Sequence, residues 1–352
     1  MAASLDGLIS HAIAERIFPG CVVLATRDGS PLLHAAFGTT MYDDAGSRAV
    51  DPRDLFDLAS LTKAVTATAA LRLADAGELR LEVEAAHYLP GLGARGVTIR
   101  HLLTHSSGLD VRLSVLREDG PDGIRAAVYA AQPLHPPGTR VSYSNINTLL
   151  LGEIVAMVAG VALDVAIAEL VLAPLGMSET RFCPPSELRA RIPPTEWDES
   201  WRGGLVHGTV HDESAHALGG VAGHAGLFGS AADMERLLRL WLQGGAWAGR
   251  QLLREATVVD ALRDHTAGLA SATGRLVRSG LGWMLDRENF MGAAPPESFG
   301  HTGFTGPAIV GVPARGLALV VLSNRTYPRR TPPPYRHHSI TAAILEALLD
   351  AP

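Results

Sequence analysis

Residues 60–73 read Ser-Leu-Thr-Lys-Ala-Val-Thr-Ala-Thr-Ala-Ala-Leu-Arg-Leu, and neither glycine nor proline follows until Gly77. Alanine and leucine favour a helix, and a glycine commonly ends one. Residues three apart on a helix share a face, so we expect Lys63 to lie within reach of the Ser60 hydroxyl. A serine needs an adjacent base to act as a nucleophile, and a lysine can be that base. The stretch therefore predicts a nucleophilic serine at the start of a helix.

The start of a helix also suits the negative charge that develops when a serine attacks a carbonyl group. Backbone N–H groups in the first turn have no partner within the helix, and the dipole of the helix is positive at this end. An oxyanion beside Ser60 would be stabilised there. We expect the backbone N–H of Ser60 to be one oxyanion donor.

Two more clusters follow in chain order, Tyr143-Ser-Asn145 and His301-Thr-Gly303. Each is common by itself, and so is Ser-x-x-Lys; the ordinary readings are a tyrosine at a helix start and a plain turn. All three in this order make a catalytic set. Lysine and tyrosine both have an ordinary pKa of about 10, so either group must be tuned by its surroundings to act as a base at neutral pH.

The three clusters resemble those of the serine β-lactamases and penicillin-binding proteins, in the branch similar to class C β-lactamases and DD-peptidases. Class A enzymes have Ser-Asp-Asn and Lys-Thr-Gly as their second and third motifs, so Tyr143 and His301 point away from class A. The resemblance spans most of the chain. It extends to His105-Ser-Ser-Gly-Leu109, to residues 210–228 and to residues 299–306.

The resemblance implies a role for each residue at the reacting bond. Ser60 attacks the acyl carbon, and Lys63 and Tyr143 share the work of the base; which of the two is the general base stays open. Asn145 points its side-chain amide at the amide or ester region of the substrate, where it can donate and accept hydrogen bonds.

The resemblance also implies how the substrate is bound. His301, Thr302 and Gly303 form an edge strand along which the substrate chain lies, and Gly303 suits a close approach of backbone. The backbone N–H of Phe304 is the second oxyanion donor.

The implied function is a serine hydrolase that forms an acyl-enzyme on an amide or ester, as a carboxylesterase, a D-peptidase or a weak β-lactamase. Class C β-lactamases usually have a lysine where this chain has His301, so we expect inefficient turnover of penicillins. The alternative is a non-catalytic protein of the same fold that binds a penicillin or a peptide. The partner is a small-molecule or peptide acyl substrate, and the reaction needs no cofactor; the number of subunits stays open.

Other motifs are weaker. Gly91-Leu-Gly-Ala-Arg-Gly96 fits a dinucleotide-binding pattern but follows Pro90 rather than a strand, so we expect a loop. Four histidines crowd one segment: His207, His211, His216 and His224. The glycines among them argue against a zinc site, so we predict no metal. His224 either contacts substrate or is a hydrogen-bonded loop histidine. The chain lacks Gly-x-Ser-x-Gly, which disfavours an α/β-hydrolase.

Composition argues against several classes of protein and partner. The 352 residues are 47% hydrophobic and 19% charged, which is typical of a globular protein with a large core. A net charge of −6 without a basic block disfavours nucleic acid as a partner. Cys21 and Cys183 form no disulfide framework. The N-terminus has helical spacing rather than the pattern of a signal peptide, so we expect a cytoplasmic protein without a membrane anchor; an extracytoplasmic place stays open if a leader has been removed.

The order of elements predicts an α+β fold of the β-lactamase/transpeptidase type. Strand-like runs at 21–38, 281–285, 308–312 and 317–322 predict an antiparallel sheet, and helices at the start of the chain and at about 339–349 cover it. The stretch between reads as mainly helical. We expect residues 1–58 and 271–352 to form the sheet lobe, residues 59–270 to form the helical lobe, and the cleft between them to hold the motifs.

Overall fold

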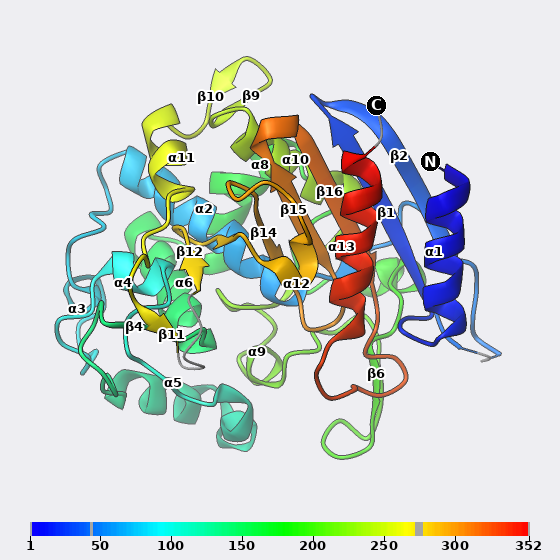
Figure 1. The fold of residues 1–352 in the computed structure, drawn as a ribbon. Helices are drawn as coiled ribbons and strands as arrows, with labels where there is room; N and C mark the ends of the chain where they lie inside the picture. The colour runs from blue at the N-terminus through cyan, green and yellow to red at the C-terminus, as the bar shows by residue number, and fades with distance from the viewer. Residues whose placement is uncertain (1, 43–44, 272–276, 351–352) are drawn as a thin grey trace.

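A computed structural model describes residues 2–42, 45–271 and 277–350. Its centre is a sheet of seven antiparallel strands in the order β12-β13-β14-β15-β16-β1-β2 (Figure 1). In chain order the strands are β1 (Gly20–Arg27), β2 (Ser30–Gly38), β12 (Arg278–Ser279), β13 (Met284–Leu285), β14 (Phe299–Thr302), β15 (Ala308–Val312) and β16 (Leu317–Ser323). Strands from both ends of the chain therefore pair, because β1 lies beside β16.

The predicted strands are largely confirmed. The hairpin of β1 and β2 turns at Asp28-Gly29, and β15 has the predicted bounds. The strand predicted over 281–285 is wrong in its first half, because only Met284 and Leu285 are extended. Gly282 instead has a φ of +82°, and a Cβ at this position would lie 2.2 Å from the Cβ of Ala67. The chain bends there to pass closely over the helix that follows Ser60.

Helices cover both faces of the sheet. On one face lie α1 (Ala2–Ala14), α12 (Glu288–Met291) and α13 (Arg336–Leu349), with an apolar core between them and the strands (Figure 1). On the other face α10 (Ala231–Leu242) packs against β1, β15 and β16. A second and larger apolar core joins this face to the helical part of the chain.

The helical part is built from short elements. Its helices are α2 (Thr62–Asp75), α3 (Ala85–Tyr88), α4 (Ile99–Leu103), α5 (Gly120–Ala130), α6 (Asn145–Ala159), α7 (Leu163–Ile167), a π-helical turn (Ala168–Leu172), α8 (Ala173–Leu175), α9 (Glu213–Ala217) and α11 (Glu255–Ala261). Its 3₁₀ segments are Ala59–Leu61, Leu113–Asp119 and Ser186–Arg191, whereas the 3₁₀ segment Pro313–Arg315 joins β15 to β16 of the main sheet. Its strands are β3 (Phe56–Asp57), β4 (Arg140–Val141), β5 (Arg181–Phe182), β6 (Glu196–Asp198), β7 (Gly204–Val206), β8 (Leu227–Gly229), β9 (Ala246–Trp247), β10 (Arg250–Gln251) and β11 (Ala270–Ser271).

Helix α2 is buried on nearly every side, as its apolar sequence predicts. Its threonines are satisfied inside the core: Thr66 donates to the carbonyl oxygen of Gly223, and Thr68 donates to that of Ala64. The helix ends at Asp75, and Gly77 follows with a φ of +80°, which is the predicted stop. A helix held this firmly is a rigid support for the serine at its start.

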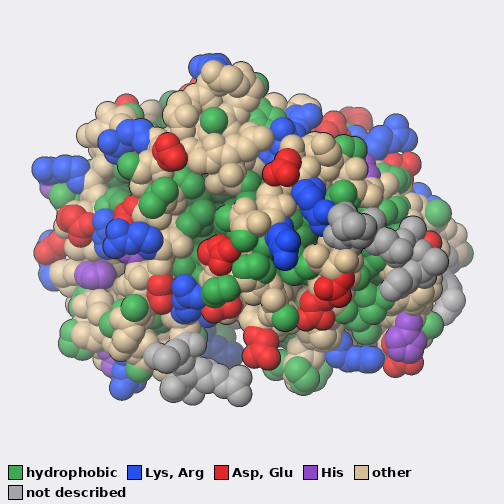
Figure 2. Space-filling view, turned by 45° about the horizontal axis from the view of Figure 1, so that its top comes forward, with side chains coloured by type: hydrophobic (Ala, Val, Ile, Leu, Met, Phe, Trp, Pro, Cys, Tyr) green, Lys and Arg blue, Asp and Glu red, His purple; other side chains and the backbone are tan. Residues whose placement is uncertain are grey.

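The α+β class is confirmed by these elements. The boundaries of the two lobes remain a prediction; α10 falls within the helical lobe in sequence, although it packs on the sheet. Acidic and basic side chains are interspersed on the face shown in Figure 2. Within residues 2–42, 45–271 and 277–350, no single helix has the length and apolarity to cross a membrane; one pair, 145–159 with 163–175, passes by length and composition but is bent by 83°.

Candidate active site

Ser60 and Lys63 are in direct contact, as predicted. The Nζ of Lys63 lies 2.8 Å from the Oγ of Ser60 and 3.0 Å from the backbone carbonyl oxygen of His224. Ser60 lies in the 3₁₀ turn that leads into α2, and Lys63 lies in the first turn of α2. The amine is therefore held from two sides. Lys63 is only 1% exposed, so little water reaches it.

The backbone just before the nucleophile is strained. Ala59 has a φ of +45°, which is unusual for a residue with a side chain. Its N–H donates to Oδ1 of Asp57 at 2.8 Å, and the other carboxylate oxygen accepts from the N–H of His211 at 2.6 Å. Thr305 donates its hydroxyl to the backbone oxygen of Asp57. Asp57 thus ties three segments around the serine, and burial raises its pKa.

Tyr143 lies just before α6 and packs against His105. Their ring centroids are 4.6 Å apart, and the Nζ of Lys63 lies 5.2 Å from the centroid of the tyrosine ring. The Nδ1 of His105 lies 3.3 Å from the N–H of Ser144 and 3.2 Å from the side-chain nitrogen of Asn147. Burial, with the nearby Lys63, lowers the pKa of His105 to about 3. The imidazole is therefore a neutral support that orients the tyrosine.

His301 and Thr302 end β14. Burial, with Lys63 nearby, lowers the pKa of His301 to about 3, so its imidazole is uncharged at neutral pH. The predicted edge strand needs correction: β14 lies between β13 and β15. However, β13 pairs only with Phe299 and Gly300, so His301 and Thr302 are paired on the β15 side alone. The short β13 leaves one side of this strand end open beside Tyr143.

Gly303 and Phe304 bring the turn after β14 against the nucleophile. A Cβ on Gly303 would lie 2.8 Å from the backbone oxygen of Leu58, so the glycine lets the protein's own chain pass closely here, and the predicted approach of a substrate chain stays a prediction. Among the described residues, the backbone N–H groups of Ser60 and Phe304 have no hydrogen-bond acceptor. The buried guanidinium of Arg325 lies 4.6 Å from the ring centroid of Phe304 and 4.3 Å from that of Tyr335, and these two rings meet edge to face.

Two cavities meet at Tyr143. We name the first, of about 340 Å³, the serine cavity; its walls include Ser60, Tyr143, Asn145 and Phe304. We name the second, of about 490 Å³, the histidine cavity; its walls include Tyr143, His301 and Thr302, with Arg287 and aromatic side chains deeper in. All eight predicted residues therefore gather at one place: six line the two cavities, Lys63 lies behind Ser60, and Gly303 lies against Leu58.

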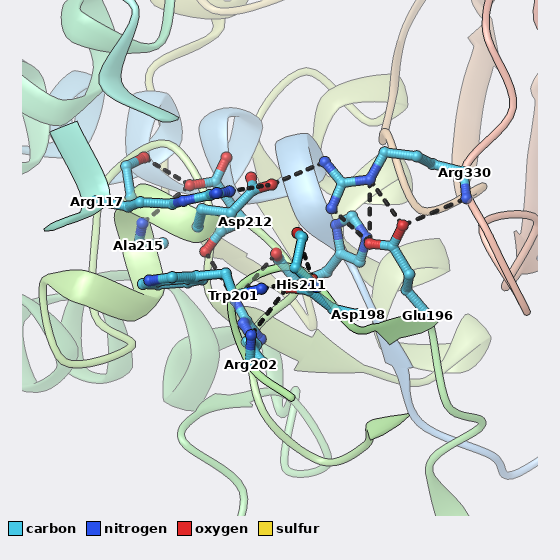
Figure 3. Close-up of polar contacts among 12 residues, drawn as sticks. Arg117, Glu196, Asp198, Trp201, Arg202, His211, Asp212, Ala215 and Arg330 are labelled. Atoms are coloured by element: carbon cyan, nitrogen blue, oxygen red, sulfur yellow. Dashed lines mark hydrogen bonds and ion pairs between the residues drawn. The ribbon is translucent and has the colours of Figure 1, made fainter. Parts of the chain in front are cut away.

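The far wall of the serine cavity is a charged network (Figure 3). Arg330 binds Glu196 with two nitrogen atoms, at 2.8 and 2.5 Å, and donates to Glu213 at 2.7 Å. His211 adds a 2.9 Å contact to Glu196. Such charge-assisted pairs, formed between segments far apart in sequence, hold the wall in one shape.

The four clustered histidines have separate partners. His207 contacts the backbone oxygen atoms of Arg189 and Ile192, His211 contacts Glu196, and His216 packs on Trp201. His224 is fully buried, and its Nε2 lies 3.2 Å from Oδ1 of Asp212. Of the two alternatives for this residue, the structure therefore favours a hydrogen-bonded loop histidine over a substrate contact. In the part of the chain that the structure describes, no group of three or more His, Cys, Asp or Glu side chains is placed to hold a metal. Both cysteines are free.

Sequence reasoning missed several residues of the site. Asp57 and Asp212 belong to no motif, although Asp57 lies three residues before Ser60 and Asp212 directly follows His211. His105 was part of the resemblance, but its contact with Tyr143 is a tertiary one. Arg287 was missed entirely, since only the return of the chain after β13 brings it beside His301.

Comparisons with known proteins agree with this geometry. The family model described as beta-lactamase matches residues 5–342. An Escherichia coli O157:H7 protein named as a D-alanyl-D-alanine carboxypeptidase is 30% identical, over 92% of this chain and 82% of that protein. The octameric penicillin-binding protein homologue from Pyrococcus abyssi has a TM-score of 0.78 at 22% identity, over 99% of this chain and 77% of that chain.

A second solved structure confirms the predicted β-lactamase/transpeptidase fold. It is EstCE1, a hydrolase with promiscuous acyltransferase activity, with a TM-score of 0.75 at 22% identity, over 97% of this chain and 98% of that chain. The family model covers nearly the whole chain, and the relatives and neighbours include a carboxypeptidase and a hydrolase. The chain therefore belongs to the β-lactamase family and is a serine hydrolase.

Proposed function

We propose that this hydrolase is acylated at Ser60 and prefers substrates whose leaving group carries a carboxylate, as an amino acid released from a peptide does. The observation that carries the proposal is the place of Arg287, a partly buried guanidinium in the wall of the histidine cavity. The acyl group then occupies the serine cavity, the leaving group occupies the histidine cavity, and the scissile bond lies beside Tyr143.

The contact between Lys63 and Ser60 supports Lys63 as the base for the first step. Lys63 takes the proton of the Ser60 hydroxyl while Oγ bonds to the acyl carbon, and the N–H groups of Ser60 and Phe304 stabilise the oxyanion. The Tyr143 hydroxyl gives a proton to the leaving nitrogen or oxygen as that bond breaks. Water then attacks the acyl carbon and gives its proton to the Tyr143 oxygen, and Lys63 returns its proton to Oγ of Ser60 as the bond to the acyl group breaks. The products are a carboxylic acid and free Ser60.

Arg287 has the features of a carboxylate receptor. Its side chain makes one hydrogen bond, 3.3 Å long, to the hydroxyl of Ser279. Among the described residues no carboxylate lies within 4.0 Å of it, although the neighbouring Arg278 is paired with Asp286 at 2.9 Å. A guanidinium can bind a carboxylate through two parallel hydrogen bonds. An unpaired arginine in the wall of a cavity beside the catalytic groups therefore suits an anionic leaving group.

The name of the E. coli relative, a carboxypeptidase, fits a leaving group with a free carboxylate. The neutral His301 offers no positive charge where class C β-lactamases usually have a lysine, so in this proposal Arg287 in the same cavity is the group that meets the carboxylate. The apolar side chains of the histidine cavity, among them Trp283, Met284 and Phe290, favour a second candidate. That candidate is an esterase whose leaving group is neutral and apolar.

The test uses two chromogenic substrates with the same acyl group and either a nitroaniline or a carboxy-nitroaniline as the leaving group. Hydrogen bonds to charged groups contribute about 1.5–3 kcal/mol, so we expect kcat/KM to be at least about tenfold higher for the carboxylated substrate. Arg287→Met should remove this preference. Arg278→Met is the matched control, because that arginine is already paired with Asp286 and should keep the preference.

Ser60→Ala separates the outcomes. Loss of all turnover in this variant supports the acyl-enzyme, and turnover that survives the substitution contradicts it. A wild-type protein that depends on Ser60 but prefers the neutral leaving group would be the esterase.

A further inference from the structure

The serine cavity carries charges that the reaction at Ser60 does not use. Carboxylate and guanidinium side chains line it: Asp212, Glu213 and Arg330, together with His211. A substrate acyl group bound at Ser60 has to meet these side chains. Their pairing therefore decides which acyl groups are accepted.

Most of this charge is neutralised within the wall. The guanidinium of Arg330 is shared between Glu196 and Glu213, and Arg117 lies 3.8 Å from Glu213 as well. Figure 3 shows Arg330 reaching from the C-terminal segment to Glu196. Because Nε, Nη1 and Nη2 of Arg330 already donate to the carboxylates of Glu196 and Glu213, the guanidinium is poorly placed to bind an anionic substrate.

Asp212 differs, because its ionisable partner among the described residues is His224 rather than an arginine. Its Oδ1 accepts hydrogen bonds from the hydroxyl of Ser214 at 2.6 Å and the N–H of Ala215 at 2.9 Å, and lies 3.2 Å from Nε2 of His224. Its Oδ2 has one long contact, 3.5 Å, with the side-chain nitrogen of Asn145. In the described part of the chain no lysine or arginine lies within 4.0 Å of this carboxylate, and the side chain is 25% exposed. One oxygen is saturated, and the other is available to a ligand.

The carboxylate is ionised at neutral pH. Burial by itself would raise the pKa of Asp212, but the nearby His224 and the hydrogen bonds at Oδ1 hold that pKa well below its usual range. A fixed negative charge therefore lies next to Asn145, which lines the same cavity as Ser60.

We propose that the acyl group of the substrate carries a primary ammonium, which binds between Oδ2 of Asp212 and the side-chain oxygen of Asn145. The proposal rests on the proposed acylation of Ser60. An ammonium donates three hydrogen bonds and gains from the negative charge, whereas a carboxylate at this place would be repelled. The Asn145 side chain offers an acceptor for a second of these hydrogen bonds.

The two cavities then have opposite charges. Asp212 makes the acyl side negative, and Arg287 makes the leaving-group side positive, with Ser60 and Tyr143 between them. A substrate with an ammonium on its acyl part and a carboxylate on its leaving group fits in one direction only, because the reverse direction would place like charges together. The substrate class is a short zwitterion, such as a free dipeptide.

The test compares two pairs of nitroanilides on the wild-type protein. It therefore does not require that an Asp212 variant folds, and the uncharged nitroaniline leaving group does not call on Arg287. The first pair is D-alanine nitroanilide and its N-acetyl form. The second pair is the Nα-acetyl nitroanilides of D-lysine and D-norleucine, which differ by a side-chain ammonium. We expect kcat/KM to be at least about tenfold higher for the amine-bearing member of at least one pair. The pair that responds shows whether the ammonium lies on the α-carbon or on the side chain.

Asp212→Asn keeps an oxygen that can cap α9 but removes the charge. Within the pair that responds, it should reduce the ratio of kcat/KM between the amine-bearing substrate and its partner without the amine to near one, whereas a merely structural role would lower both values alike. Glu118→Gln also removes one negative charge, but from an exposed glutamate that contacts Arg117 and does not line the serine cavity, so it should keep the wild-type ratio.

The outcomes separate the two proposals. If neither amine-bearing substrate is preferred while turnover still requires Ser60, the ammonium site is wrong and the proposed function stands. If no substrate is turned over in a manner that requires Ser60, both proposals fall together.

Discussion

A 3.0 Å hydrogen bond joins Nζ of Lys63 to the backbone carbonyl oxygen of His224, 161 residues further along the chain. The same amine lies 2.8 Å from the nucleophile, so the loop of His224 fixes the amine relative to Ser60. The loop is itself tightly packed, since a Cβ on Gly223 would lie 2.2 Å from the backbone oxygen of Thr148. The amine that we propose as the base is therefore positioned from a distant part of the sequence.

Gly223→Ala should displace this loop and its carbonyl group. A misplacement of about 1 Å near a reacting group can cost roughly 10²-fold in rate, so we expect a loss of that order in kcat on an activated ester. Gly204→Ala is the matched control, because a Cβ there meets nothing within 4 Å, and its activity should match the wild type. Full activity in Gly223→Ala would show that the loop does not position Lys63.

Lys63→Met should remove the base but leave the fold, because methionine suits a buried position. General base catalysis contributes roughly 10²–10⁴-fold, and we expect a loss in this range in the rate of acyl-enzyme formation, followed by intact mass. Lys63 is the only lysine in the chain, so a lysine-specific isotope label reports on this one amine. Its NMR signal should shift when Ser60 is acylated; a signal that does not respond would place the amine outside the site.

Tyr143→Phe keeps the ring that packs against His105 and removes only the hydroxyl. If this hydroxyl protonates the leaving group, an amide, which is a poor leaving group, should suffer most. We expect a loss of roughly 10²-fold on a nitroanilide and less than about tenfold on a nitrophenyl ester with the same acyl group. Equal losses on both would instead favour Tyr143 as the base that activates Ser60.

His337→Leu should change the pH dependence of stability. His337 is 3% exposed, neither of its ring nitrogens has a hydrogen-bond partner among the described residues, and burial lowers its pKa to about 2. Between pH 6.5 and about pH 2, the unfolded chain therefore binds one more proton, at His337, than the folded protein does. The free energy of unfolding accordingly falls as the pH falls below 6.5.

Urea unfolding at pH 7 and pH 5 measures this effect. Between these values His337 should account for about 2 kcal/mol of the wild-type loss, and this part should vanish in His337→Leu. The variant should be at least as stable at pH 7, because leucine leaves no unpaired polar atom in the core. An unchanged dependence on pH would mean that His337 is protonated in the folded protein.

Local sequence was enough for the nucleophile and for most of the elements around it. The spacing of Ser60 and Lys63 predicted their contact, because three residues along a helix always return to the same face. The hairpin of β1 and β2 and the end of α2 at Gly77 were likewise predictable from turn and cap chemistry. The family motifs brought Tyr143, Asn145 and the turn after β14 into the same prediction.

Only the tertiary structure decided the surroundings of these groups. Arg287 follows the short β13 and the bend at Gly282, and Oδ2 of Asp212 is left with one long contact because Ser214, Ala215 and His224 all meet Oδ1. Backbone preferences act over a few residues and set helices, strands and turns. The pairing and burial of charges arise only when distant segments pack to bury their apolar surface, so they determine which substrate the serine meets.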